Sequence, residues 1–249
     1  MATLSPTTSI HGPLTGQSGR GGQPPQRDGG GNGNGGNGSS PNYFHRLRRA
    51  RLGLIVVMVP IIMLFVSFTS AYVVRQGMPT FNERTGQMVR DWIQVNLPVG
   101  LLMVNTLLLL ISSVTMELAR RQVARRLALA PAAAIPGVSI GRERSLPWLG
   151  ATIVLGVGFL VGQWLAWGEL QNRGFYLASN PSSSFVYLLT ATHAIHLMGG
   201  LIALAYAGAT SLLNRPIEVR RIVIDVAAWY WHFMAALWIY VFALMAFMR

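Results

Sequence analysis

The sequence predicts an all-α membrane protein: a bundle of five transmembrane helices preceded by a disordered N-terminal tail. Hydrophobic residues make up 51% of the 249 residues and charged residues only 11%, whereas roughly a quarter of a soluble domain is charged. Five stretches without a charged residue each exceed the roughly 20 residues that an α-helix needs to cross about 30 Å of hydrocarbon. Lipid offers the backbone no hydrogen-bond partner, so each stretch must be helical.

The predicted tail comprises residues 1–42 and is rich in glycine, proline and serine. It holds 12 of the 27 glycines and five of the 13 prolines, and no apolar run interrupts it. Such a segment can bury too little apolar surface to fold, which predicts disorder. It also lacks the apolar core of a signal peptide, so we expect the first hydrophobic segment to remain in the mature protein.

Residues 43–249 form the predicted transmembrane domain. Its five spans are 52–74, 93–116, 146–168, 183–213 and 226–248. Pro60 lies inside the first span and predicts a kink, because proline removes a helical hydrogen bond. Pro98 lies in the first turns of the second span, where proline is well tolerated.

The arginines predict the orientation of the spans in a cell membrane. There is no lysine, and arginines close to a span resist translocation. With the N-terminus in the cytoplasm, fifteen arginines lie on that side and five on the other, so we expect the C-terminus outside. The high pI does not indicate nucleic-acid binding, because the cluster from Arg46 to Arg51 borders a span and anchors its topology.

Few polar side chains fall at membrane depth, and no carboxylate does. Glu117, Glu169 and Asp225 fall at the ends of the predicted spans, which argues against a proton relay or a charge-coupled transporter within this chain. We expect no catalytic, cofactor-binding or metal-binding residue here, and cysteine is absent. The remaining polar residues are predicted to make structural contacts between helices; they are His193, His196, His232, Gln163, Asn105 and Trp229.

Helical spacing groups these residues with small ones on single faces. In the span 183–213, one face carries His193, His196, Gly200, Ala203 and Ala207. Around the span 226–248, one face carries Asp225, Trp229, His232, Ala235, Ala236 and Ala243. Small residues beside polar ones suit close helix packing with hydrogen bonds across it. Because a five-helix bundle cannot use every such face, we expect at least one to be free for a partner.

Four motifs in register resemble subunit III of haem-copper cytochrome oxidases. The most specific is Trp229, Tyr230, Trp231, His232 and Phe233 followed by Trp238. The others are Asn105 and Thr106 with Ser112, Ser113 and Thr115; Phe159 and Leu160 with Gln163; and Thr190, His193 and His196 with Gly200. The end of the first span, Ala71 to Arg75, is also similar. The resemblance covers residues 52–248, and five helices correspond to the short form of the family.

The resemblance implies an accessory, non-catalytic subunit of a cytochrome c oxidase. Such a subunit stabilises catalytic subunit I in a complex that also contains subunit II, binds structural phospholipid, and leaves the haems and copper to its partners. Three positions depart from the family, which usually has carboxylates where this chain has Ile61, Ala166 and Ala235. These departures weaken the case for a proton-uptake role.

Three alternatives remain open from the sequence. Relatives of subunit III also accompany quinol oxidases and nitric-oxide reductase systems. An independent b-type haem electron carrier would pair His232 with His193 or His196 as axial ligands. A small secondary transporter would require an inverted repeat and broken helices, and five spans do not divide into two equal halves.

Overall fold

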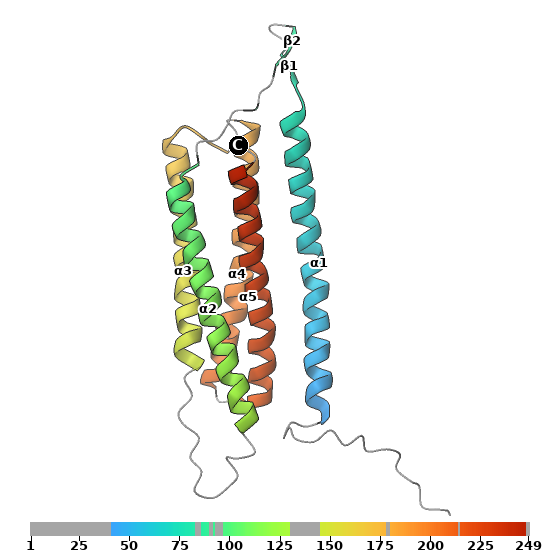
Figure 1. Ribbon diagram of the computed structural model, residues 1–249, viewed down its shortest axis with the longest axis vertical. Helices are drawn as coiled ribbons and strands as arrows, with labels where there is room; N and C mark the ends of the chain where they lie inside the picture. The colour runs from blue at the N-terminus through green and yellow to red at the C-terminus, as the bar shows by residue number, and fades with distance from the viewer. Residues whose placement is uncertain are drawn as a thin grey trace, which may run out of the picture. The chain divides into compact units, whose positions relative to one another are not determined.

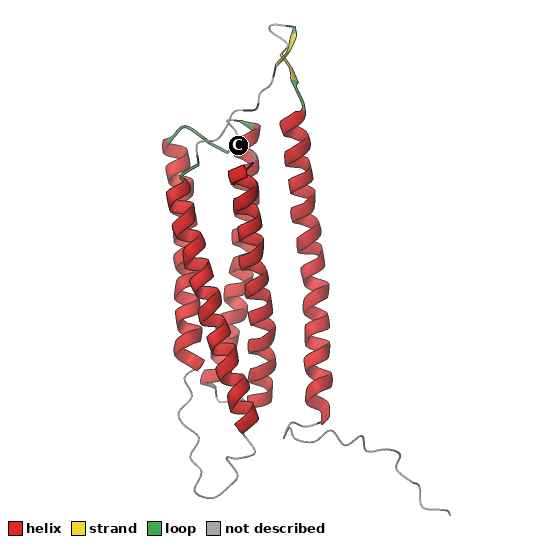
Figure 2. Cartoon of the chain, in the orientation of Figure 1, coloured by secondary structure: helices red, strands yellow, loops and turns green. Residues whose placement is uncertain are grey.

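Five long helices dominate the computed structural model, which describes residues 41–82, 86–89, 92, 97–129, 145–177, 180–213 and 215–247. The helices are α1 (Pro41–Gly77), α2 (Val99–Leu129), α3 (Ser145–Asn172), α4 (Pro181–Leu212) and α5 (Ile217–Phe247). All five are long and apolar enough to cross a membrane, and they run roughly side by side (Figures 1 and 2). The predicted five-helix class is confirmed. The predicted tail lies almost entirely outside the described residues.

Three helices extend well beyond their charge-free stretches. α1 begins at Pro41 rather than Leu52, α2 ends at Leu129 rather than Met116, and α5 begins at Ile217 rather than Val226. A charge-free stretch marks the part of a helix that lies in hydrocarbon, whereas arginine-rich flanks are good helix formers and continue the helix. The prediction that Glu117 and Asp225 lie at helix ends is therefore wrong, because both are well inside their helices.

The two prolines occupy different places relative to the helices: Pro60 lies inside one helix, and Pro98 lies just before another. α1 continues through Pro60 as one helix. Pro98 immediately precedes α2, and its carbonyl accepts a hydrogen bond from the backbone N–H of Leu102 at 3.1 Å. Residues 93–96, which the sequence predicts as the start of this span, lie outside the described residues.

α2, α3, α4 and α5 pack around one apolar core. Its largest fully buried side chains include Trp231, Trp238 and Phe159, and α2 and α3 share the most extensive contact. A methyl group on Gly162 would collide with the side chain of Asn105, so glycine permits the close approach of these two helices. α1 packs on α4 and α5, and most of its surface is exposed.

A short antiparallel hairpin follows α1. Strands β1 (Thr80–Asn82) and β2 (Gln87–Val89) pair with Phe81 opposite Met88. Gly86 precedes β2 with φ of 63°, a left-handed conformation that glycine adopts without strain. The sequence does not predict this hairpin, because strands of three residues carry almost no periodic signal.

Candidate interhelix polar site

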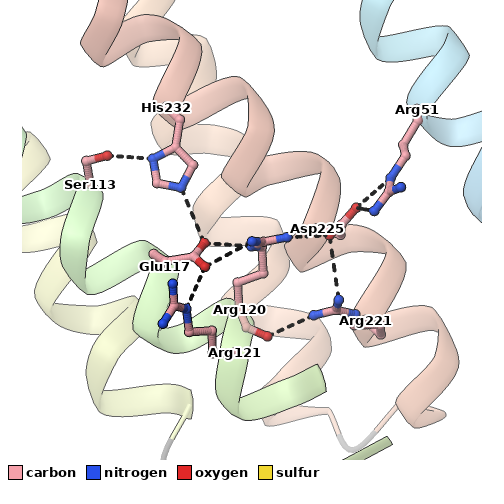
Figure 3. A network of polar contacts seen from close by, with 8 residues as sticks. All are labelled: Arg51, Ser113, Glu117, Arg120, Arg121, Arg221, Asp225 and His232. Atoms are coloured by element: carbon pink, nitrogen blue, oxygen red, sulfur yellow. Dashed lines mark hydrogen bonds and ion pairs between the residues drawn. The ribbon is translucent and has the colours of Figure 1, made fainter. Parts of the chain in front are cut away.

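A fully buried carboxylate, that of Asp225 on α5, joins three helices (Figure 3). Arg51 of α1 donates to Oδ2 through Nη2 at 2.8 Å and through Nε at 2.9 Å. Arg120 of α2 donates to Oδ1 at 3.3 Å, and Arg221, one turn before Asp225, lies 3.8 Å from the same oxygen. A buried charge is tolerated only when it is paired and hydrogen-bonded, so these arginines make the position possible.

A second carboxylate, Glu117 on α2, adjoins the first through Arg120. Arg120 forks onto it, with Nε 2.7 Å from Oε2 and Nη2 2.9 Å from Oε1, and Arg121 donates to Oε1 at 2.7 Å. Arg221 also donates to the backbone carbonyl of Arg120 at 2.8 Å. Arg120 therefore links both acids, and the network connects α1, α2 and α5 (Figure 3).

Sequence reasoning missed this network, although the chain carries a signal for it. Glu117 precedes Arg120 and Arg121 by three and four residues, the spacing of ion pairs on one helix face. Arg221 precedes Asp225 by four residues. A prediction that extended the helices past the apolar stretches would have placed these pairs inside the bundle. The pairing of Asp225 with Arg51 on another helix has no signal in the sequence.

The three histidines at depth face different neighbours. His193 on α4 is fully buried, with its ring 5.8 Å from that of Phe159 and 5.1 Å from that of Trp238. Neither of its ring nitrogens has a hydrogen-bond partner among the described residues. His196 bonds through Nδ1 to the carbonyl of Thr192 on its own helix at 2.7 Å. The structure thus surrounds His193 with aromatic rings.

His232 on α5 faces α2 and extends the charge network. Its Nδ1 shares a hydrogen bond with the hydroxyl of Ser113, and its Nε2 lies 3.7 Å from Oε2 of Glu117. Within the described chain, no group of three His, Cys, Asp or Glu side chains gathers as a metal site. His232 contacts Ser113 and Glu117, whereas His193 lies against Phe159 and Trp238, so the two rings face different neighbours.

Asn105, Gln163 and Trp229 differ in how far they enter the bundle. Asn105 donates from Nδ2 to the carbonyl of Phe159 at 3.5 Å, which links α2 to α3. Gln163 is buried, and its Oε1 has no partner in the described part of the chain. Trp229 is 53% exposed and lies outside the core of the bundle.

Three tryptophans act as hydrogen-bond donors between helices. The indole N–H of Trp231 donates to the hydroxyl of Ser112, and that of Trp238 to the hydroxyl of Thr106, each at 3.0 Å. Both bonds join α5 to α2. Trp167 of α3 donates to Thr190 of α4, also at 3.0 Å. Large buried rings with a satisfied N–H contribute both apolar burial and register.

An apolar groove of about 500 Å³ lies between α1, α4 and α5. Leu54 and Val57 line it from α1, Ala203 from α4, and Val223 and Ala227 from α5. Polar contacts also join α1 to α5, among them the Arg51–Asp225 pair and a hydrogen bond from Tyr240 to Thr69 at 2.9 Å. The groove therefore separates helices that are also held together by polar bonds.

These features define a class: a multi-pass helical membrane protein in which several polar side chains bond from one helix to another. Within that class, the chain belongs to the cytochrome c oxidase subunit III family, whose model matches residues 44–248. This match confirms the resemblance that the four motifs indicate.

Individual relatives agree with the family. A probable cytochrome c oxidase subunit 3 of Mycobacterium leprae is 30% identical over 102 residues, which cover 41% of this chain and 50% of the relative. Cytochrome c oxidase subunit 3 of Pylaiella littoralis is 25% identical over 192 residues, 77% of this chain and 64% of the relative. Cytochrome c oxidase subunit 3 of Triticum aestivum is 26% identical over 193 residues, which cover 77% of this chain and 66% of the relative. The chain thus matches about half the length of its mycobacterial relative.

Proposed function

We propose that this chain is the accessory, non-catalytic subunit III of a haem-copper terminal oxidase, a cytochrome c oxidase of aerobic respiratory electron transport. It binds catalytic subunit I and subunit II in a hetero-oligomeric complex and stabilises the catalytic subunit. The family match over residues 44–248 carries this proposal. The names of the relatives, all cytochrome c oxidase subunits, favour cytochrome c over quinol as the electron donor.

The polar groups of the bundle support a structural role. Asp225 pairs with Arg120 across helices, Arg120 also pairs with Glu117 on its own helix, and the hydroxyls of Ser112 and Thr106 accept from indoles. Haem and copper chemistry belongs, on this proposal, to the partner subunits. Ile61, Ala166 and Ala235, where the family usually has carboxylates, are all buried apolar side chains here, which favours packing over proton transfer at these positions.

The groove between α1, α4 and α5 is the proposed site of a structural phospholipid. Its lining is apolar and its volume is about 500 Å³, which suits an acyl chain, because apolar grooves bury apolar surface of the ligand. An acyl chain there would fill the space between α1 and the other helices, and so would stiffen the attachment of α1.

The proposed location is the cell membrane, with the N-terminus in the cytoplasm and the C-terminus outside. Arginine distribution supports this orientation. Arg51, Arg120 and Arg221 gather with Asp225 in one network, and all three belong to the arginines that the prediction places on the cytoplasmic side.

Removing the chain from its oxidase tests the proposal. Purification of the complex from a host that lacks this chain should yield an oxidase that still reduces oxygen but loses activity sooner during turnover. Restoring the chain should restore the lifetime. An oxidase with unchanged stability and turnover lifetime would contradict the proposed role.

A further inference from the structure

One side of α5 is left open by the bundle. The open face of α5, defined here as Trp229, His232, Ala236 and Tyr240, spans about 80° at 100° per residue. Trp229 is 53% exposed, His232 is 36% exposed by its side chain, and Ala236 and Tyr240 are also exposed. Part of this face is the polar, small-residue face that the sequence predicts for helix contacts.

α1 and α2 border the open face on opposite sides. Tyr240 donates to Thr69 of α1, and His232 bonds to Ser113 of α2. By the helical repeat, Trp229 and Ala236 lie between these two contacts. α5 stands between α1 and α2 in the ribbon view (Figure 1). The open face therefore lies on α5 between its contacts with α1 and with α2.

The open face has a polar edge that hydrocarbon cannot satisfy. His232 lies seven residues beyond Asp225, or about 10 Å further along the helix axis. Its Nε2 is 3.7 Å from Glu117, which is longer than a hydrogen bond. A partly exposed imidazole beside a carboxylate is costly when it faces lipid tails, but a neighbouring protein helix can bond to it.

Charge also favours a different protein as the partner over a second copy of this chain. Asp225 and Glu117 contact four arginines, Arg51, Arg120, Arg121 and Arg221, so the network beside the open face has a net positive charge. Arg51 and Arg121 are 44% and 65% exposed. A helix that ends here with acidic side chains would match this charge, whereas the identical network of a second copy would repel it.

We propose that the open face of α5 is the docking surface for a transmembrane helix of another oxidase subunit. That helix packs against Ala236, where a small side chain allows close backbone approach, and it presents a hydrogen-bonding side chain to His232. Its cytoplasmic end carries acidic residues toward Arg51 and Arg121. The inference rests on the proposed function, since it identifies the surface through which the subunit joins its complex.

Photo-crosslinking in the intact complex tests the inference. Benzoylphenylalanine is placed singly at Trp229 and Ala236 in the full chain, and at two matched positions on other helices, Val154 of α3 and Ile202 of α4, which are 70% and 72% exposed. After irradiation of native membranes, each crosslinked product is identified by mass spectrometry. We expect Trp229 and Ala236 to crosslink to an oxidase subunit and both control positions to crosslink to lipid.

Other results would overturn the inference in distinguishable ways. If the chain co-purifies with the oxidase but only Val154 or Ile202 crosslinks to a subunit, the proposed function stands and the docking surface is elsewhere. Crosslinks from Trp229 and Ala236 only to lipid, to a second copy or to residues 1–40 also overturn it. If the chain never co-purifies with an oxidase, both the function and the inference fail.

A steric variant gives a second readout. Ala236→Trp adds a large ring to the exposed centre of the open face, and Ile202→Trp adds the same ring to an exposed site on α4. We expect Ala236→Trp to reduce the co-purified catalytic subunit about tenfold, the loss that corresponds to one well-packed interface contact. Ile202→Trp should leave the yield unchanged. Equal yields from both variants would contradict the docking surface.

Discussion

Single residues in this bundle matter mainly through the partners they satisfy on other helices. Asp225 is the clearest case, because it is fully buried and its carboxylate contacts arginines from α1, α2 and α5. A buried pair contributes little net stability, but breaking it leaves unpaired charge. The sequence shows only the local partner, Arg221, whereas Arg51 and Arg120 lie 174 and 105 positions from Asp225 and are brought to it by the packing of the helices.

Asp225→Asn should strongly destabilise the protein, because it leaves Arg51, Arg120 and Arg221 without their shared carboxylate. We expect a loss of about 3–5 kcal/mol in the free energy of unfolding, measured by denaturant titration in detergent. Glu169→Gln is the control, since the exposed pair of Glu169 with Arg173 should contribute about 0.2–1 kcal/mol. Equal effects of the two substitutions would show that the network is dispensable.

Substitution by alanine should affect stability in opposite ways at two glycines that lie one turn apart on α3. A methyl group at Gly162 would collide with Asn105, whereas one at Gly158 would meet nothing within 4 Å. Gly162→Ala should cost about 1–3 kcal/mol through overpacking. Gly158→Ala should be neutral or stabilising by up to about 1 kcal/mol, because alanine favours helix. Thermal unfolding of the two variants checks this, and a stable Gly162→Ala protein would refute the close contact of α2 and α3.

Helices are the level at which the sequence is most informative. Hydropathy alone predicts five spans and their order, because the hydrocarbon thickness fixes their minimum length. Hydropathy does not give the positions of the helix ends, so the prediction that Glu117 and Asp225 lie at helix ends is wrong. Periodicity groups residues into faces but cannot say which face turns inward: α5 buries Trp231 and Trp238 and leaves Trp229 open. That choice depends on how the helices pack.

The groove between α1, α4 and α5 leads to a prediction about lipid binding between helices. Ala203 lines the groove, and its neighbour Ile202 is 72% exposed. Ala203→Phe should fill the groove and displace the proposed phospholipid, so that native mass spectrometry finds less lipid bound to the purified chain. Ile202→Phe adds a ring outside the groove and should leave bound lipid unchanged. Undiminished lipid in Ala203→Phe would remove the groove as the binding site.

The whole molecule is best understood as part of a larger assembly. Its own bundle satisfies the Asp225 and Glu117 network, yet α1 is loosely packed and the open face of α5 keeps polar atoms at membrane depth. A subunit that completes its packing on a partner explains both features. The sequence motifs predict the family, but the face that remains open becomes visible only when the five helices are placed together.

The most direct test of this account is affinity purification of the full chain from host membranes in mild detergent, with a reduced-minus-oxidised spectrum and mass spectrometry of the product. The account predicts that a large haem-bearing subunit and oxygen-consuming activity co-purify with the chain in constant ratio. Recovery of the chain alone, carrying its own haem spectrum, would contradict the account and would make His193, His196 and His232 candidate ligands.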